Sequence, residues 1–112
     1  MAASVQQNDN MQIANAILQQ LGGGRFVTMT GARDVFAIDA GLQFKMPARF
    51  AKDGINFVKI ELAESDTYTM TFGKVYTSKG MPEYKEICVE PLVYADSLQA
   101  TFTSCTGLDT HL

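Results

Sequence analysis

Apolar residues near the start of the chain recur at every third or fourth position, which is the spacing of one helical stripe. The stripe consists of Ala14, Ile17, Leu18 and Leu21. It predicts a helix over residues 11–21, whose opposite face carries amides and no charge, so tertiary packing must stabilise it. Residues 1–10 are polar and lack this pattern, and we expect them to form a flexible tail.

Three consecutive glycines follow this helix and are predicted to end it. Glycine enters the left-handed region without a steric penalty, so Gly22 and Gly23 are interpreted as structural residues. The next run, 25–30, is rich in aromatic and β-branched residues and is predicted to be a strand that Gly31 closes. A phosphate-binding loop follows a strand and opens a helix, so the predicted order argues against one here.

Alternating apolar and polar positions then predict an antiparallel meander of about five strands. After residues 25–30, the strand-like runs are 35–38, 42–46, 55–62, 67–75 and 84–89. We expect a hairpin connection at 39–41 with Gly41 at positive φ, and a bulge at Gly73, where the alternation breaks. Residues 77–83 are predicted to form an exposed loop.

A second amphipathic stripe predicts a C-terminal helix between Pro91, which suits the first helical position, and Gly107, which suits the stop. The stripe consists of Tyr94, Leu98, Thr101, Phe102 and Cys105. The pattern therefore predicts a single α+β domain over residues 11–112, with a helix, a five-stranded meander and a second helix. Because each helix carries one stripe, we expect both to cover the same face of the sheet.

The composition excludes several classes of protein. The 112 residues are 46% hydrophobic, enough for the core of one domain, and the net charge of −3 argues against strong electrostatic binding to duplex DNA. Apolar runs are too short to cross a bilayer, and residues 1–10 lack the apolar segment of a signal peptide. We therefore expect a cytoplasmic protein, in a host cell if its origin is viral, with no membrane partner.

The residues that usually carry catalysis or bind metals are few and scattered. His111 is the only histidine and lies next to the C-terminus, where a catalytic base would be poorly held. The acidic pairs in predicted turns lack the spacing of a calcium loop. Cys88 and Cys105 are 17 positions apart and are interpreted as small buried hydrophobes, since a disulfide requires that they meet in space. We expect no enzyme, no metal and no cofactor.

The most specific chemical option is a surface for single-stranded nucleic acid. Lys45 and Lys59 point outward on neighbouring predicted strands, and Phe57 shares their face, which suits phosphate neutralisation and base stacking. The candidate binding residues are Lys45, Phe57, Lys59, Arg49, Lys52 and Lys74. The alternative interpretation is that these lysines are ordinary solvent-side residues that protect sheet edges.

Short motifs spread along the chain carry a resemblance to a known family. They are residues 18–26, 29–33, 42–45, 57–60, 71–75, 94–99, 102–103, 106–108 and 110–112. In these motifs the chain resembles a family of small uncharacterised proteins of bacteriophages, prophages and mobile elements. The loop 77–83 is longer than the family pattern, and Asp109 stands where an aromatic residue is expected.

The resemblance implies a phage or mobile-element origin and transfers no catalytic residues. With the acidic charge, it leads us to expect a non-enzymatic protein that binds a host protein, for example as an inhibitor of host defence. The alternative is an accessory protein that binds single-stranded nucleic acid through Lys45, Phe57 and Lys59. Homodimerisation through edge strands would suit either function.

Overall fold

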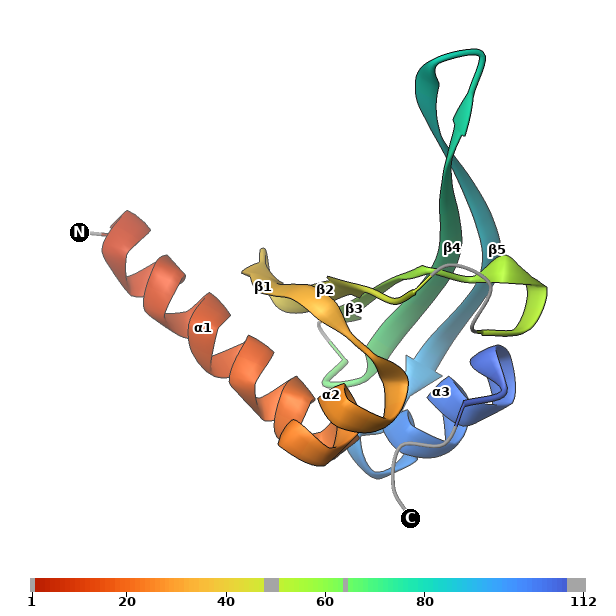
Figure 1. Cartoon of the computed structure of the whole chain (residues 1–112). Coiled ribbons are helices and arrows are strands. Elements are labelled where there is room, and N and C mark those ends of the chain that lie inside the picture. The colour runs from red at the N-terminus through yellow and green to blue at the C-terminus, as the bar shows by residue number, and fades with distance from the viewer. Residues whose placement is uncertain (1, 48–50, 64, 109–112) are drawn as a thin grey trace.

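The computed structural model describes residues 2–47, 51–63 and 65–108, with side chains from residue 10 onward. The elements in chain order are α1 (Ala2–Leu21), α2 (Gly24–Thr30), β1 (Arg33–Ile38), β2 (Gly41–Lys45), η1 (Lys52–Gly54), β3 (Phe57–Leu62), β4 (Tyr68–Ser78), β5 (Met81–Val93), η2 (Ala95–Ser97) and α3 (Leu98–Thr106). The strands form one antiparallel sheet in the order β1-β2-β3-β4-β5 (Figure 1).

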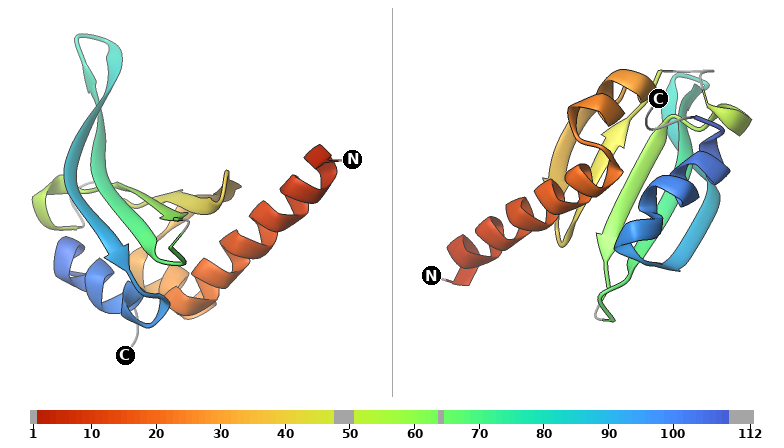
Figure 2. Two further views of the ribbon diagram at one scale, coloured as in Figure 1. Left: turned by 180° about the vertical axis from the view of Figure 1, so that it is seen from behind. Right: turned by 90° about the horizontal axis from the view of Figure 1, so that it is seen from below.

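All three α-helices lie on one face of this sheet, as the views from behind and below show (Figure 2). The predicted α+β class is therefore confirmed, with helices at both ends of an antiparallel meander and a shared helical face. No helix in the described ranges is long and apolar enough to cross a membrane.

The first helix begins much earlier than its apolar stripe. Helix α1 starts at Ala2, so residues 2–10 of the predicted tail are helical. Alanine and glutamine are good helix formers, which favours this extension without an apolar stripe. Farther along α1, the Asn10 side chain accepts a hydrogen bond of 2.8 Å from the backbone of Ala40, which joins the helix to the turn between β1 and β2.

Residues 25–30 belong to helix α2, so the strand predicted there is wrong. Gly22 and Gly23 adopt φ of 125° and 61°, and the chain turns there before a second helix begins. Phe26 and Thr30, four positions apart, are fully buried, which is helical spacing. Burial of this face outweighs the strand preference of the β-branched residues. The glycines therefore connect two helices: they follow α1 and precede α2. A phosphate-binding loop would instead follow a strand.

The hairpin between β4 and β5 is longer than the sequence predicts. Residues 77–83 do not form a loop, because the pairing continues to Ser78 and Met81 and only Lys79 and Gly80 turn. Both turn residues have positive φ, 53° and 79°, as in a type I′ hairpin turn. The ends of the two strands project from the sheet as a two-stranded arm, residues 75–84 (Figure 1).

Two irregularities shape the last strand. A register shift lies between Phe72 and Gly73, at the position of the predicted bulge, but its extra residue is Ile87 of β5 and not Gly73. Pro91 lies inside β5 and does not begin the last helix, which starts at Leu98. As β5 is an edge strand, a proline there need not interrupt the ladder. A second register shift, with Leu92 at φ 59°, accommodates this part of the strand.

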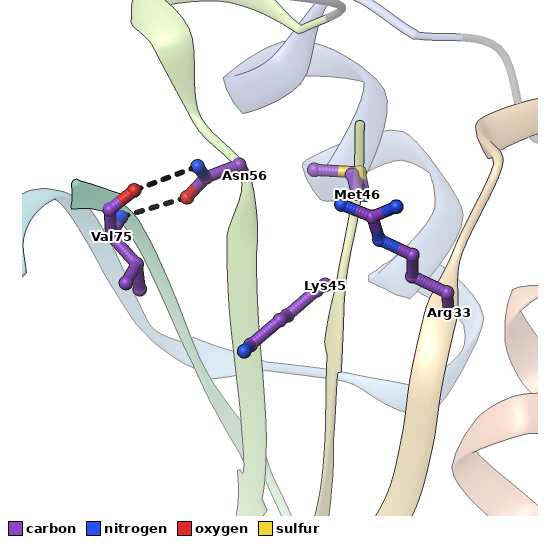
Figure 3. A pocket seen from close by; sticks show the side chains of 5 residues that line it. All are labelled: Arg33, Lys45, Met46, Asn56 and Val75. Carbon is purple, nitrogen blue, oxygen red and sulfur yellow. Dashed lines mark hydrogen bonds between the residues drawn. The ribbon is translucent and has the colours of Figure 1, made fainter. Parts of the chain in front are cut away.

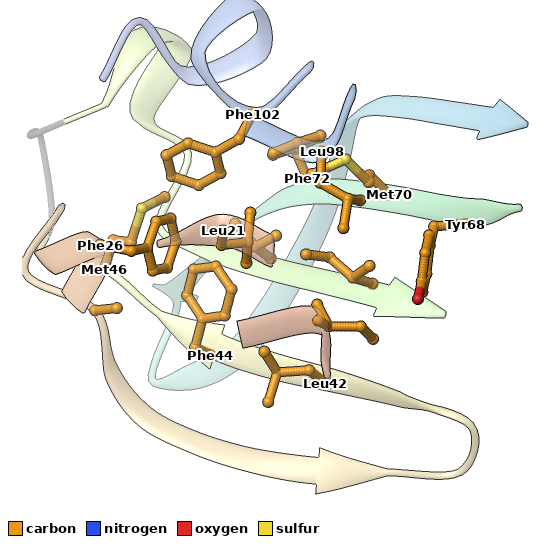
Figure 4. Packing of buried hydrophobic residues seen from close by; sticks show 14 of the residues in the cluster. Leu21, Phe26, Leu42, Phe44, Met46, Tyr68, Met70, Phe72, Leu98 and Phe102 are labelled. Atoms are coloured by element: carbon orange, nitrogen blue, oxygen red, sulfur yellow. The ribbon is translucent and has the colours of Figure 1, made fainter. Parts of the chain in front are cut away.

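The core fills the space between the helices and one face of the sheet (Figure 4). Its centre is an aromatic group in which Phe26 of α2 meets Phe102 of α3 at 5.0 Å and Phe44 of β2 at 5.4 Å between ring centroids. Both contacts are edge-to-face, the preferred geometry for aromatic pairs. The fully buried members of the core include Ile17, Leu21, Phe26, Phe44, Val58, Ile60, Met70, Phe72, Leu98 and Phe102.

Helices α2 and α3 end with the same local device. A threonine four residues after the buried phenylalanine donates a hydrogen bond back to it, Thr30 to the Phe26 carbonyl and Thr106 to the Phe102 carbonyl. The next residue is a glycine at positive φ, Gly31 at 70° and Gly107 at 75°. The backbone amide that follows each glycine, Ala32 or Leu108, donates a hydrogen bond to the threonine hydroxyl. The repeated Phe-x-x-x-Thr-Gly pattern therefore ends each helix directly behind its core aromatic residue.

Gly41 is required for a reason that differs from the predicted one. The residue with positive φ in the β1–β2 turn is Ala40, at 54°, and not Gly41. A Cβ atom on Gly41 would lie 2.2 Å from the carbonyl oxygen of Ile60 on the neighbouring strand. Because that obstacle is backbone, the ladder itself would have to move to accept any side chain.

Gly41→Ala is therefore expected to lower the free energy of unfolding by about 1–3 kcal/mol, the usual range for overpacking a close contact. Gly24→Ala is the matched control, because a Cβ there meets nothing within 4 Å. That variant should be neutral or slightly stabilising. Urea unfolding followed by circular dichroism measures both, and equal stability of the two variants would contradict the expected clash.

Candidate functional site

The side of the sheet opposite the helices, here called the open face, gathers cations and aromatic rings. Strand register sets one row across all five strands. In it Arg33 lies opposite Lys45, Lys45 opposite Phe57, Phe57 opposite Gly73, and Gly73 opposite Glu86. Directly opposed residues on antiparallel strands point to the same side. The row therefore places two positive charges beside an aromatic ring.

A second row lies next to the first on the same face. It pairs Phe36 with Gln43, and Gln43 with Lys59. Phe36 is 51% exposed and belongs to the open face because a bulge in β1 separates it from Arg33 by three positions. That bulge breaks the period-two pattern, so alternation did not indicate Phe36. Arg33 was missed because the strand was predicted to begin only at residue 35, whereas β1 begins at Arg33.

Tyr84 covers the far end of the first row. Its ring meets Phe57 edge-on at 5.7 Å between centroids and lies where a side chain at Gly73 would be. A Cβ on Gly73 would come within 2.4 Å of the Tyr84 ring, so the ring can pack here only because Gly73 has no side chain. Burial, and secondarily the Glu86 carboxylate, raises the pKa of Tyr84, so its hydroxyl stays neutral at physiological pH. Tyr84 is 47% exposed and offers an accessible aromatic surface.

A pocket of about 200 Å³ opens at the end of the first row (Figure 3). It is lined by Arg33, Lys45, Met46, Asn56 and Val75. The lining therefore includes two cations and no acid. Within the described residues the single ion pair is Lys59 with Glu61, at 3.7 Å and with both side chains well exposed, a weak interaction. An anionic group entering the pocket would meet the charges of Arg33 and Lys45.

The Asn56 side chain holds one wall of this pocket in place. Its Oδ1 atom accepts a hydrogen bond of 2.8 Å from the Val75 amide, and its Nδ2 donates one of 3.0 Å to the Val75 carbonyl (Figure 3). The amide group thus replaces a backbone pair just before β3 begins. It connects the base of the arm to the strand that carries Phe57.

The structure separates the six residues that the sequence proposed for binding. Lys45, Phe57 and Lys59 lie together on the open face. Lys74 lies beside Gly54 on the side of the helices, with its Nζ 5.9 Å from the Tyr76 ring, and Lys52 lies beside Gly107 at the end of α3. These two lysines therefore do not contribute to the open face. Arg49 and His111 lie outside the described residues.

The two cysteines meet where β5 passes α3. Their Sγ atoms are 3.2 Å apart, and the Glu90 carboxylate lies 3.6 Å from the Cys88 sulfur. The three ligand atoms all lie within 4.8 Å of one another, an arrangement of donors that a soft metal could use. Both cysteines are only half-buried, so the interpretation as buried hydrophobes is incomplete.

Comparisons of the chain with protein-family models, with curated proteins and with solved structures found no match. The resemblance to phage-encoded proteins therefore stays a prediction. The function has to be inferred from the chemistry that the fold places on the open face.

Replacing Asn56 tests the pocket wall. Asn56→Ala leaves the Val75 amide and carbonyl without their partner and is expected to cost about 1–3 kcal/mol in the free energy of unfolding. Gln43→Ala is the matched control, because Gln43 is also a partly buried amide on this sheet and makes no side-chain hydrogen bond in the described structure. Chemical denaturation should show the larger loss for Asn56→Ala, and losses of equal size would contradict the assigned role.

Proposed function

We propose that this protein is a non-enzymatic binding module that holds single-stranded nucleic acid across its open face. The observation that supports the proposal is the row in which Arg33 and Lys45 lie beside Phe57, with Tyr84 behind it. Cations that contact phosphates next to rings that stack on bases are the two elements of single-strand recognition. The pocket between Arg33 and Lys45 would take a phosphate, and Phe36 would extend the aromatic surface.

A single strand suits this surface better than a duplex. Rings can stack only on bases that are not already paired, and half-exposed rings such as Tyr84 and Phe36 supply such contacts. The face carries three cations, Arg33, Lys45 and Lys59, but Lys59 pairs with Glu61, and Glu86 lies opposite Gly73 on the same face. The face would therefore neutralise few phosphates, and the chain as a whole carries −3. Affinity would therefore depend on stacking as much as on charge, and its dependence on salt would be shallow.

Lys45→Glu should weaken binding of a fluorescent single-stranded oligonucleotide about tenfold or more, because it replaces a phosphate contact with repulsion. Lys74→Glu is the matched control, since it makes the same charge change on the side of the helices. Fluorescence anisotropy over a series of salt concentrations measures affinity and salt slope together. No binding by the wild type, or equal losses in the two variants, would reject the open face as a nucleic-acid surface.

A host protein is the second candidate partner, and the arm favours it. The arm exposes Tyr76 and Met81, by 39% and 65%, and places Lys79 and Glu83 near its tip, so it is apolar without a dominant charge. The outer edge of β5 also presents backbone groups that an extended segment could pair with, which is a common mode of peptide binding. A phage protein that blocks a host enzyme or a defence protein would need such a surface, and a second copy of the chain could use the same edge.

Met81→Asp separates this candidate from the first. The side chain is exposed, so the change should leave stability within about 0.5 kcal/mol while removing the apolar tip. After nuclease treatment of host lysate, a protein partner should be retained by the wild type and by Lys45→Glu, and lost with Met81→Asp. Retention that disappears with nuclease or with Lys45→Glu would instead assign the interaction to nucleic acid.

A further inference from the structure

Cys88 and Cys105 form a pair of thiols that the proposed binding function does not use. Cys88 lies in β5 opposite Phe72, on the helical side of the sheet, and Cys105 lies in the last turn of α3. Their sulfur atoms are 3.2 Å apart and both side chains are half-buried. A small reagent can therefore reach the pair, and neither sulfur has to travel far to reach the other.

We propose that these two thiols are a redox-sensitive site, at which a reversible disulfide fastens α3 to β5. The bond would close a loop that contains the end of β5, η2 and the first two turns of α3. Val93, Leu98 and Phe102 are the buried core residues of this segment. It would act independently of any ligand on the open face, which lies on the other side of the sheet.

The oxidant is a low-molecular-weight disulfide such as oxidised glutathione, and the reaction proceeds by two exchanges. In the first exchange the Cys88 thiolate attacks one sulfur of the small disulfide, which forms a mixed disulfide and releases one small thiolate. In the second, the Cys105 thiolate attacks the Cys88 sulfur and releases the other. Both small thiolates take up the protons that the two cysteines lost, so two protein thiols are oxidised and one small disulfide is reduced.

The surroundings set the order of these exchanges. Burial raises the pKa of the Cys105 thiol to about 12, with smaller contributions from the hydrogen bond and charge of Cys88 and from the charge of Glu90. The positive charge of Lys52 acts in the opposite direction and lowers this pKa. Cys105 is therefore protonated at neutral pH and is a poor first nucleophile. Once Cys88 is held in a mixed disulfide, its contributions to that pKa are lost and those of burial, Glu90 and Lys52 remain. Deprotonation of Cys105 then becomes easier at the step that needs it.

A metal centre is the competing use of the same atoms, and the surroundings favour it less. Structural zinc sites are almost always closed by four protein ligands. The described residues supply three here, and one of them, Glu90, is an exposed carboxylate. The Lys52 ammonium acts on Cys105, and a positive charge in that place would oppose a bound cation.

Intact-mass spectrometry of the full chain in a series of oxidised and reduced glutathione mixtures tests the proposal. The wild type should lose two hydrogens and carry no adduct, and a peptide map without reductant should contain the Cys88–Cys105 bond. Cys105→Ser should accumulate one glutathione on Cys88, whereas Cys88→Ser should react much more slowly. A stable adduct on the wild type, or thiols that stay reduced where Cys105→Ser is modified, would overturn the proposal.

Two further readouts separate the disulfide from other outcomes. Oxidation should raise the Tm of the wild type by on the order of 10 °C, since a loop of this length is closed, and should leave the Tm of the double serine variant unchanged. Zinc chloride is the metal probe. Protection of both wild-type thiols by one equivalent of zinc, with no disulfide formed after its addition, would show that the site is a metal centre and overturn the proposal.

Discussion

The edge-to-face contact between Phe26 and Phe102 is the interaction on which the rest of the fold depends. The two rings meet at 5.0 Å with planes inclined by 71°, and Phe44 joins them from the sheet (Figure 4). Removing any of these rings would open a cavity that the neighbours could refill only in part. The contact connects α2, α3 and β2, which are far apart in sequence, and it draws both helices to the same side of the strands.

Gathering the apolar side chains on one side leaves the other side of the sheet uncovered by the helices (Figure 2). On that side, register decides which residues become neighbours, and it places Arg33, Lys45 and Phe57 in one row. Gly73 contributes by the absence of a side chain, because the vacant position seats Tyr84 against Phe57. The cations and rings of the open face are therefore a product of strand pairing and of two bulges.

Patterns with an undisturbed period predicted structure well, and patterns interrupted by irregularities did not. Alternation predicted the strand 42–46, and its alternate residues Leu42 and Phe44 are buried in the core. The β-branched run 25–30 was interpreted as a strand because its composition outweighed the four-residue spacing of Phe26 and Thr30, which burial shows to be decisive. For the candidate site, Lys45, Phe57 and Lys59 were found by alternation, whereas Phe36 and Tyr84 lie beyond bulges that shift the alternation, and Arg33 lies before the predicted start of its strand.

By itself the sequence determined which positions are apolar, where α1 ends before Gly22 and α3 ends at Gly107, and that an antiparallel meander lies between helices. These features depend on the spacing of residues close together in the chain, and local sterics and burial preferences decide them. Only the tertiary structure decided that Lys52 and Lys74 lie away from Lys45, and that the sulfur atoms of two cysteines 17 positions apart come within 3.2 Å of each other. Such proximities follow from strand register and helix packing, which bring together segments whose separation along the chain carries no information about their distance in space.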